Sequence, residues 1–290
     1  MKNLKTVLLL AFITVTAQAQ TGISGFSKSE GDVTISLSSS NETYDEVLLA
    51  PAEIDGVPVF NDVTITSYNL YAEFGITDRF TVSVNMPYII SEGNATDAIL
   101  QENGFSNKRE GFQDLSLNFK YLVKSFDFSN SKLNFLANLG YETPMSKYEV
   151  DEGLQSILAI GNRSNRINGI GVAHFKMNNG IFATGQLGYS GRTNDVPNAI
   201  LSQLKIGYAA SKFYGDLYIG SQKSTSGVDI LGEGFQGFFP ATRVSYTKIG
   251  LNLYAPIYKG IGISAGASQI IDGRNVGKAT AVFGGLNYSF

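Results

Sequence analysis

The chain has 290 residues, of which 43% are hydrophobic and only 16% are charged, against about a quarter charged in an ordinary soluble domain. It has no cysteine and one histidine, which excludes disulfide scaffolds and cysteine-ligated metal sites. The formal net charge of −3 argues against a nucleic-acid-binding protein, which would carry a basic patch. Tyrosine, phenylalanine and glycine are abundant, so we expect a β-rich protein with no metal, cofactor or nucleic-acid partner.

Residues 1–19 have the pattern of a secretory signal peptide. Two lysines, an apolar stretch at residues 7–15 and a small-x-small cleavage site ending at Ala19 occur in the order that secretion requires. The alternative is a short buried helix. Cleavage after Ala19 leaves residues 20–290 as one domain. No later segment reaches the roughly 18 consecutive apolar residues of a transmembrane helix, so a membrane-spanning mature protein would have to be a barrel.

From residue 31 onward, hydrophobic and polar residues alternate with a period of two, which is typical of β-strands. The clearest case is residues 79–89, in which Phe80, Val82 and Val84 alternate with polar neighbours. Turn signals divide the region into twelve predicted strands, at residues 31–43, 62–74, 79–89, 112–123, 132–142, 164–176, 180–190, 199–209, 212–222, 241–254, 260–270 and 277–290.

Short and long connections alternate between these strands. The short ones lie near residues 75–78, 124–131, 177–179, 210–211 and 255–259, and the long ones near 44–61, 90–111, 143–163, 191–198, 223–240 and 271–276. Short periplasmic turns and long outer loops are typical of outer-membrane barrels. We therefore predict an all-β fold, a transmembrane antiparallel up-and-down β-barrel of about twelve strands, in the outer membrane of a Gram-negative bacterium with both termini periplasmic.

A soluble sandwich or lipocalin-like barrel would also alternate. Aromatic residues at both ends of the apolar face favour the membrane barrel, because they match the aromatic girdles at the two interfaces. Those at the predicted periplasmic rim are Phe74, Phe80, Phe213 and Phe290, and those at the outer rim are Tyr88, Tyr141 and Tyr189.

The last six residues resemble the C-terminal signal that outer-membrane barrels present to the insertion machinery. Gly285, Tyr288 and Phe290 stand in the pattern Gly-x-x-aromatic-x-Phe. The expected partners are therefore outer-membrane lipid and the barrel-insertion machinery, besides a small-molecule solute.

If the apolar set faces lipid, the polar set faces the lumen, because each lysine turned toward mid-membrane would cost about 2–4 kcal/mol. The candidate lumen-lining residues are Tyr71, Glu73, Asn85, Asp114, Asn118, Lys120, Lys205, Asp216, Tyr218 and Lys248. Glu73 with Arg79, and Asp216 with Lys205, are expected to form ion pairs. Such pairs either close the lumen or line a polar path through it.

Apolar aromatic residues stand in the long connection at residues 223–240, where a solvated loop should be polar. Phe235, Phe238 and Phe239 are candidates for a gate that contacts an apolar solute. Packing of one loop against another is the alternative interpretation. The same choice applies to residues 45–60.

Two motifs carry a resemblance to a known family. Residues 71–88 read YAEFGITDRFTVSVNMPY, and residues 111–117 read GFQDLSL, followed later by Glu142-Thr143-Pro144. This is similar to the outer-membrane family named for the meta-cleavage pathway of phenol degradation. Within the motif, Gly75 and Asp78 suit a tight turn, and Pro87 suits a strand end.

The resemblance implies a role in moving small, often aromatic or hydrophobic compounds across the outer membrane, with no catalytic residues. We therefore predict a passive channel rather than an enzyme. A non-conducting structural or adhesive barrel that binds a partner through residues 90–111 and 143–163 is the alternative. A barrel phospholipase is disfavoured, because it needs a histidine–serine pair and the lone His174 has no serine two residues on. The sequence does not define the oligomeric state.

Overall fold

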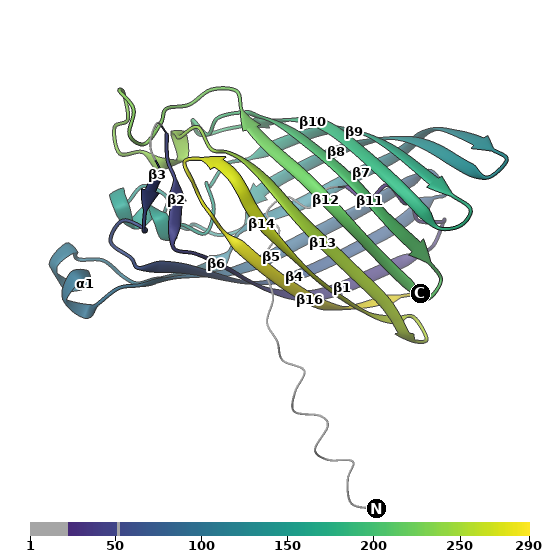
Figure 1. Cartoon of the computed structure of the whole chain (residues 1–290), viewed down its shortest axis with the longest axis horizontal. Coiled ribbons are helices and arrows are strands. Elements are labelled where there is room, and N and C mark those ends of the chain that lie inside the picture. The colour runs from purple at the N-terminus through teal and green to yellow at the C-terminus, as the bar shows by residue number, and fades with distance from the viewer. Residues whose placement is uncertain (1–22, 51–52) are drawn as a thin grey trace, which may run out of the picture.

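The computed structural model describes residues 23–50 and 53–290 and forms a closed antiparallel β-barrel (Figure 1). The predicted signal peptide, residues 1–19, lies outside the described residues. Each of the twelve predicted strands overlaps one strand of the barrel. Their bounds are β1 Val33–Tyr44, β4 Asp62–Thr77, β5 Phe80–Asn94, β7 Asp114–Phe128, β8 Ser131–Pro144, β9 Arg166–Met177, β10 Ile181–Arg192, β11 Ala199–Ala210, β12 Phe213–Ser224, β13 Ser245–Tyr258, β14 Ile261–Arg274 and β16 Thr280–Ser289.

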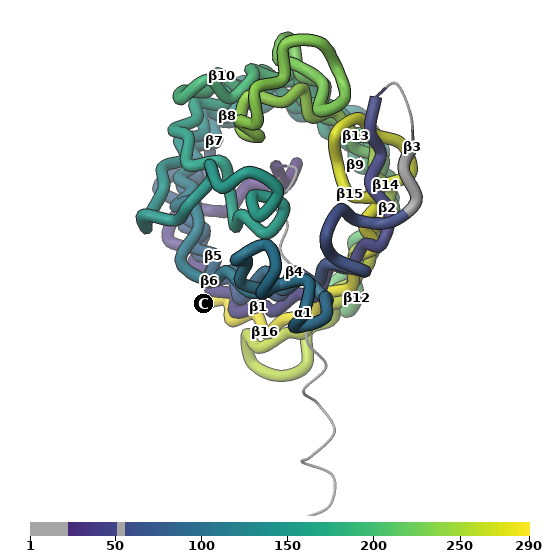
Figure 2. The backbone as a smooth tube through the Cα atoms, turned by 90° about the vertical axis from the view of Figure 1, so that its left-hand side faces the viewer, coloured from purple at the N-terminus to yellow at the C-terminus, as the bar shows by residue number. Residues whose placement is uncertain are grey.

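Pairing of the first barrel strand with the last closes the barrel, as the view along its axis shows (Figure 2). β1 pairs with β16 from Thr34 opposite Ser289 to Thr43 opposite Thr280, and it pairs with β4 on its other side. Closure gives each barrel strand two hydrogen-bonded neighbours. In hydrocarbon this pairing is obligatory, because unpaired backbone N–H and C=O groups cost several kcal/mol each.

Alternation separates the two faces of the barrel wall. Leu217, Leu187 and Leu37 are 67%, 65% and 61% exposed on the outside, whereas His174 and Thr184 on the inside are each 2% exposed. The predicted rim aromatics Phe74, Phe213 and Phe290 are likewise exposed. The face that would meet water in a soluble protein is thus apolar, and the enclosed face is polar, as a lipid-embedded barrel requires.

Pro87 does not end a strand, contrary to the expectation from the sequence, but lies inside β5. β5 pairs with β7 as far as Asn85 and with the short strand β6 (Lys108–Phe112) from Tyr88 onward. Pro87 stands at this change of partner, where its missing N–H removes no ladder bond. Its carbonyl oxygen accepts a hydrogen bond from the N–H of Gln113 at 3.1 Å.

The long connections carry structure that alternation does not predict. Val57, Phe60, Val63 and Leu158 form a buried apolar cluster there. None of the helices in the described residues is long and apolar enough to cross a membrane. The additional elements at this end are the three-stranded sheet of β2 Glu46–Leu48, β3 Glu53–Asp55 and β15 Val276–Gly277, the helix α1 Asp97–Asn103, and 3-10 helices at Gly153–Leu158 and Phe239–Ala241.

A charge on the outer face tests the membrane assignment. We expect Leu217→Lys, in the middle of β12, to lower the free energy of unfolding in lipid vesicles by about 2–4 kcal/mol. Leu231→Lys is the control, because Leu231 is exposed in a long connection and surface changes usually stay within about 0.5 kcal/mol. Equal stabilities of the two variants in urea titrations would contradict a lipid-facing position for Leu217.

Candidate functional site

The candidate site is the lumen together with the mouth formed by the long connections. Six of the ten predicted lumen residues border one central cavity of about 120 Å³, namely Tyr71, Glu73, Asn85, Asp114, Asn118 and Lys120. On the wall formed by β11–β13, Asp216 and Tyr218 are 4% and 6% exposed. Lys205 lies 3.5 Å from Asp216, and the Lys248 ammonium lies 6.0 Å from the ring centroid of Tyr246.

Residues 23–30, called the N-terminal segment here, run inside the barrel ahead of β1. The side-chain amide of Gln186 binds Ile23 twice, accepting from its N–H at 2.9 Å and donating to its carbonyl oxygen at 2.6 Å. The Lys120 ammonium donates to the carbonyl oxygens of Ser24 and Phe26 at 3.3 and 2.6 Å. Side chains of β7 and β10 thus hold the segment by its backbone.

An aromatic cluster fixes the middle of the N-terminal segment. The ring of Phe26 meets His174 and Phe182 edge-on, with centroids 4.5 and 5.2 Å apart. The Lys176 ammonium lies 5.3 Å from the same ring. Gly25 is buried against His174, and a Cβ there would lie 2.3 Å from Nδ1. Only glycine therefore fits this point of the segment without displacing the histidine.

Gly75 belongs to the N-terminal segment's binding site rather than to a turn, which corrects the expectation from the sequence. It lies within β4, its N–H donates to Asp32 O at 2.9 Å, and its carbonyl oxygen accepts from Gly31 N–H at 2.9 Å. A Cβ at Gly75 would lie 2.0 Å from the carbonyl oxygen of Ser29. Asp78 does lie in the turn, and its carboxylate accepts from the N–H of Glu30 at 3.0 Å.

The N-terminal segment divides the lumen into two compartments. Ile23 and Ser24 form part of the wall of the central cavity of about 120 Å³. Gly25, Phe26 and Ser27 border a second cavity of about 560 Å³ toward the short-turn end. The lumen is therefore interrupted at residues 23–27 by backbone and by one aromatic ring.

Charges in the lumen are paired across strands. Lys120 lies 3.2 Å from Glu73, so the expected pair of Glu73 with Arg79 is wrong. Arg79 lies at the turn and donates instead to the carbonyl oxygens of Leu122 and Val123. The expected pair of Lys205 with Asp216 is present, and Asp216 also accepts hydrogen bonds from Tyr214 and Asn252.

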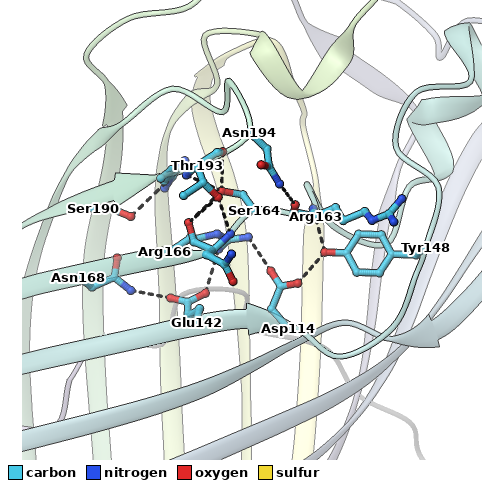
Figure 3. A network of polar contacts seen from close by, with 12 residues as sticks. Asp114, Glu142, Tyr148, Arg163, Ser164, Arg166, Asn168, Ser190, Thr193 and Asn194 are labelled. Carbon is cyan, nitrogen blue, oxygen red and sulfur yellow. Dashed lines mark hydrogen bonds and ion pairs between the residues drawn. The ribbon is translucent and has the colours of Figure 1, made fainter.

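A buried network lies between the central cavity and the long-loop end (Figure 3). Arg166 donates to Asp114 and to Glu142, each at 3.0 Å. The hydroxyl of Tyr148 donates to the second oxygen of Asp114 at 2.6 Å, and Asn168 donates to Glu142 at 2.6 Å. Burial, reinforced by Asp114, raises the pKa of Tyr148 above its usual value, so this hydroxyl keeps its proton.

The predicted gate residues lie in the connection between β12 and β13, residues 225–244. Phe235 and Phe239 contact each other edge-on at 5.2 Å, and Phe238 is half-buried beside them. Phe239 also borders a largely apolar cavity of about 210 Å³ beneath the connection. The connection is tethered by Asp229, whose carboxylate accepts from Arg274 Nε at 2.6 Å and from the Asn275 amide at 2.9 Å.

The C-terminal motif lies at the short-turn end. Tyr288 and Phe290 are exposed, with ring centroids 5.4 Å apart, and Gly285 lies opposite Ser38 in the β1–β16 ladder. In the interior, His174 contacts Thr184 through Nδ1 at 2.7 Å and packs on Phe26. The described residues contain no cluster of three or more metal-ligating side chains.

The sequence matches no protein-family profile and no curated protein. Solved structures of outer-membrane barrels do share the fold. One is the crystal structure of an outer membrane channel from Pseudomonas putida F1, with a TM-score of 0.69 and 13% identity over 93% of this chain and 100% of that chain. The KdgM porin has a TM-score of 0.50 and 10% identity over 88% of this chain and 99% of that chain. The protein thus has the fold of an outer-membrane β-barrel, as predicted.

Sequence reasoning missed the N-terminal segment and two arginines at the mouth. The segment has no alternation, and only the glycines at its contact points, Gly25 and Gly75, hint at a close approach of two backbones. Arg166 and Arg192 stand at strand ends that the alternation left in or next to loops. Their position on the inner face follows only from the observed register of β9 with β10.

Loss of one carboxylate tests the buried network. We expect Asp114→Ala to lower the free energy of unfolding by about 3–5 kcal/mol, because it leaves part of the charge of a buried arginine unpaired. Asp127→Ala in the same strand is the matched control. Asp127 pairs with Lys132 at 3.3 Å but is 75% exposed, so its loss should cost at most about 1 kcal/mol. Equal losses in urea titrations would contradict the network.

The tether of the gate connection should depend on pH. The hydrogen bond from Arg274 lowers the pKa of Asp229 from 3.8 to about 2. The tether is therefore fully present above pH 4 and is lost as the pH falls toward 2. At pH 4, pepsin should cleave the connection more slowly in the wild type than in Asp229→Asn, and at pH 2 the two rates should converge. A ratio that stays constant from pH 4 to pH 2 would count against the tether.

Proposed function

We propose that the protein is an outer-membrane channel for passive diffusion of small solutes, held closed in this conformation by the N-terminal segment. The observation that carries the proposal is a closed barrel with an apolar outer face and a polar interior, interrupted by a few residues of extended chain. A lumen filled only to be stable would need side chains from the wall. Here backbone contacts from a separate segment complete the seal.

The short-turn end is proposed to face the periplasm and the long connections the outside of a Gram-negative cell. This orientation agrees with the loop lengths of outer-membrane barrels and places the N-terminal segment and Phe290 on the periplasmic side. A signal peptide at residues 1–19, insertion through the C-terminal aromatic motif, and contact with outer-membrane lipid belong to the same proposal.

Small aromatic or hydrophobic compounds are the proposed solutes. The apolar cavity of about 210 Å³ between the long connections supports this, because Leu49, Ile157 and Phe239 line a space that a porin for sugars would not need. The resemblance to the family named for the meta-cleavage pathway of phenol degradation points the same way. No catalytic role is proposed for His174.

Removal of the N-terminal segment tests the channel. Deletion of residues 23–28 joins the two lumen compartments, so we expect single-channel conductance in planar bilayers to rise several-fold, together with swelling of liposomes in a small neutral sugar. Phe26→Ala, which removes the aromatic contact, should raise conductance less. Ser27→Ala is the control, because the side chain of Ser27 is exposed.

An intact, correctly folded deletion variant that conducts no better than the wild type would contradict the proposal. In that case the lumen would not be the conduction path.

A further inference from the structure

Two arginines lie directly opposite each other on the inner face at the long-loop end. Arg166, the first residue of β9, is the register partner of Arg192, the last residue of β10. Like charges in directly opposite positions of a ladder are destabilising. Such an arrangement in a barrel that pairs its other lumen charges needs a compensating group.

The carboxylates nearby compensate only one of the two arginines. Arg166 is held by Asp114 and Glu142. Arg192 has neutral partners instead, since its guanidinium donates to Ser190 Oγ at 3.1 Å and to Gln222 Oε1 at 2.7 Å. In the described part of the chain no carboxylate lies within ion-pair distance of Arg192. The mouth therefore keeps one positive charge in excess.

A cavity of about 190 Å³ opens beside this surplus charge. Both arginines line it, and Val196, Phe239 and Val244 supply apolar surface on its other sides. The Nε of Arg166 is buried and has no hydrogen-bond partner among the described residues. The cavity thus offers a cation with unused donors next to apolar walls.

This arginine cavity adjoins the apolar cavity of about 210 Å³ beneath the gate connection. The two share Phe239, Pro240 and Thr242 in their walls. Beyond the shared residues, Val47, Leu154 and Ile230 line the apolar part. Together the two cavities form an elongated space that is cationic at the lumen end and apolar at the loop end.

We propose that this space is a binding site for small monocarboxylic acids with an apolar body, which names the solute class and so rests on the proposed channel function. The planar fork of Arg192 matches a carboxylate, which can accept two parallel hydrogen bonds from it. One uncompensated charge fits a monoanion better than a phosphate. The apolar body would lie against Phe239, which also makes the gate aromatic contact.

Binding of benzoate to the mature full-length protein in lipid nanodiscs tests the site by calorimetry. Benzamide is the neutral probe of the same shape. We expect saturable binding of benzoate that is at least about tenfold tighter than that of benzamide, because hydrogen bonds to charged groups are the stronger kind. Arg192→Gln should weaken benzoate binding by about tenfold or more and leave benzamide unchanged. Arg192→Lys, which keeps the charge without the fork, should lie between.

Lys223→Gln is the matched control, since Lys223 is exposed next to Gln222 at the same end of β12 and should not affect either probe. If Arg192→Gln fails to form a barrel, Phe239→Ala replaces it and should weaken benzoate and benzamide by similar factors. Equal affinity of the wild type for the two probes, absence of saturable benzoate binding, or an unaltered Arg192→Gln would overturn the site. A barrel that conducts but ignores benzoate refutes only this inference, and one that binds benzoate but never conducts refutes only the channel.

Discussion

Closure of the backbone ladder is the constraint on which the rest of the structure depends. Because a lipid environment offers no partner for a free N–H or C=O, β1 has to meet β16, and every residue between them is committed to one face or the other. The period of two then decides chemistry as well as shape. Leucines such as Leu217 must face outward, and whatever is polar must share a narrow interior.

Crowding polar groups into that interior makes charge compensation the second organising principle. Lys120 with Glu73, Lys205 with Asp216, and Arg166 with two carboxylates each neutralise charge across neighbouring walls. Lys120 has a second task, since it also holds the backbone of the N-terminal segment. The same interactions that stabilise the wall therefore position the seal, and Arg192 stands out because it takes part in neither.

The twelve strands were predictable because alternation is a local signal that depends on each strand alone. Strand ends were less so, since strands such as β5 and β8 continue past the apolar band into polar sequence. Partners across strands were only partly accessible. Lys205 and Asp216 lie on consecutive strands, whereas Glu73 chose Lys120 two strands away in sequence over the nearer Arg79, which reaches backbone carbonyls. The N-terminal segment has no period at all, so only its contacts reveal it.

The seal and the wall have different thermodynamic character. Each residue of the N-terminal segment held in one conformation gives up about 1–2 kcal/mol of backbone entropy, and its release would break no rung of the barrel ladder. Opening by this route is thus a local order–disorder transition of extended chain, favoured by warming and independent of global unfolding. The barrel would stay rigid while its bore responds to temperature.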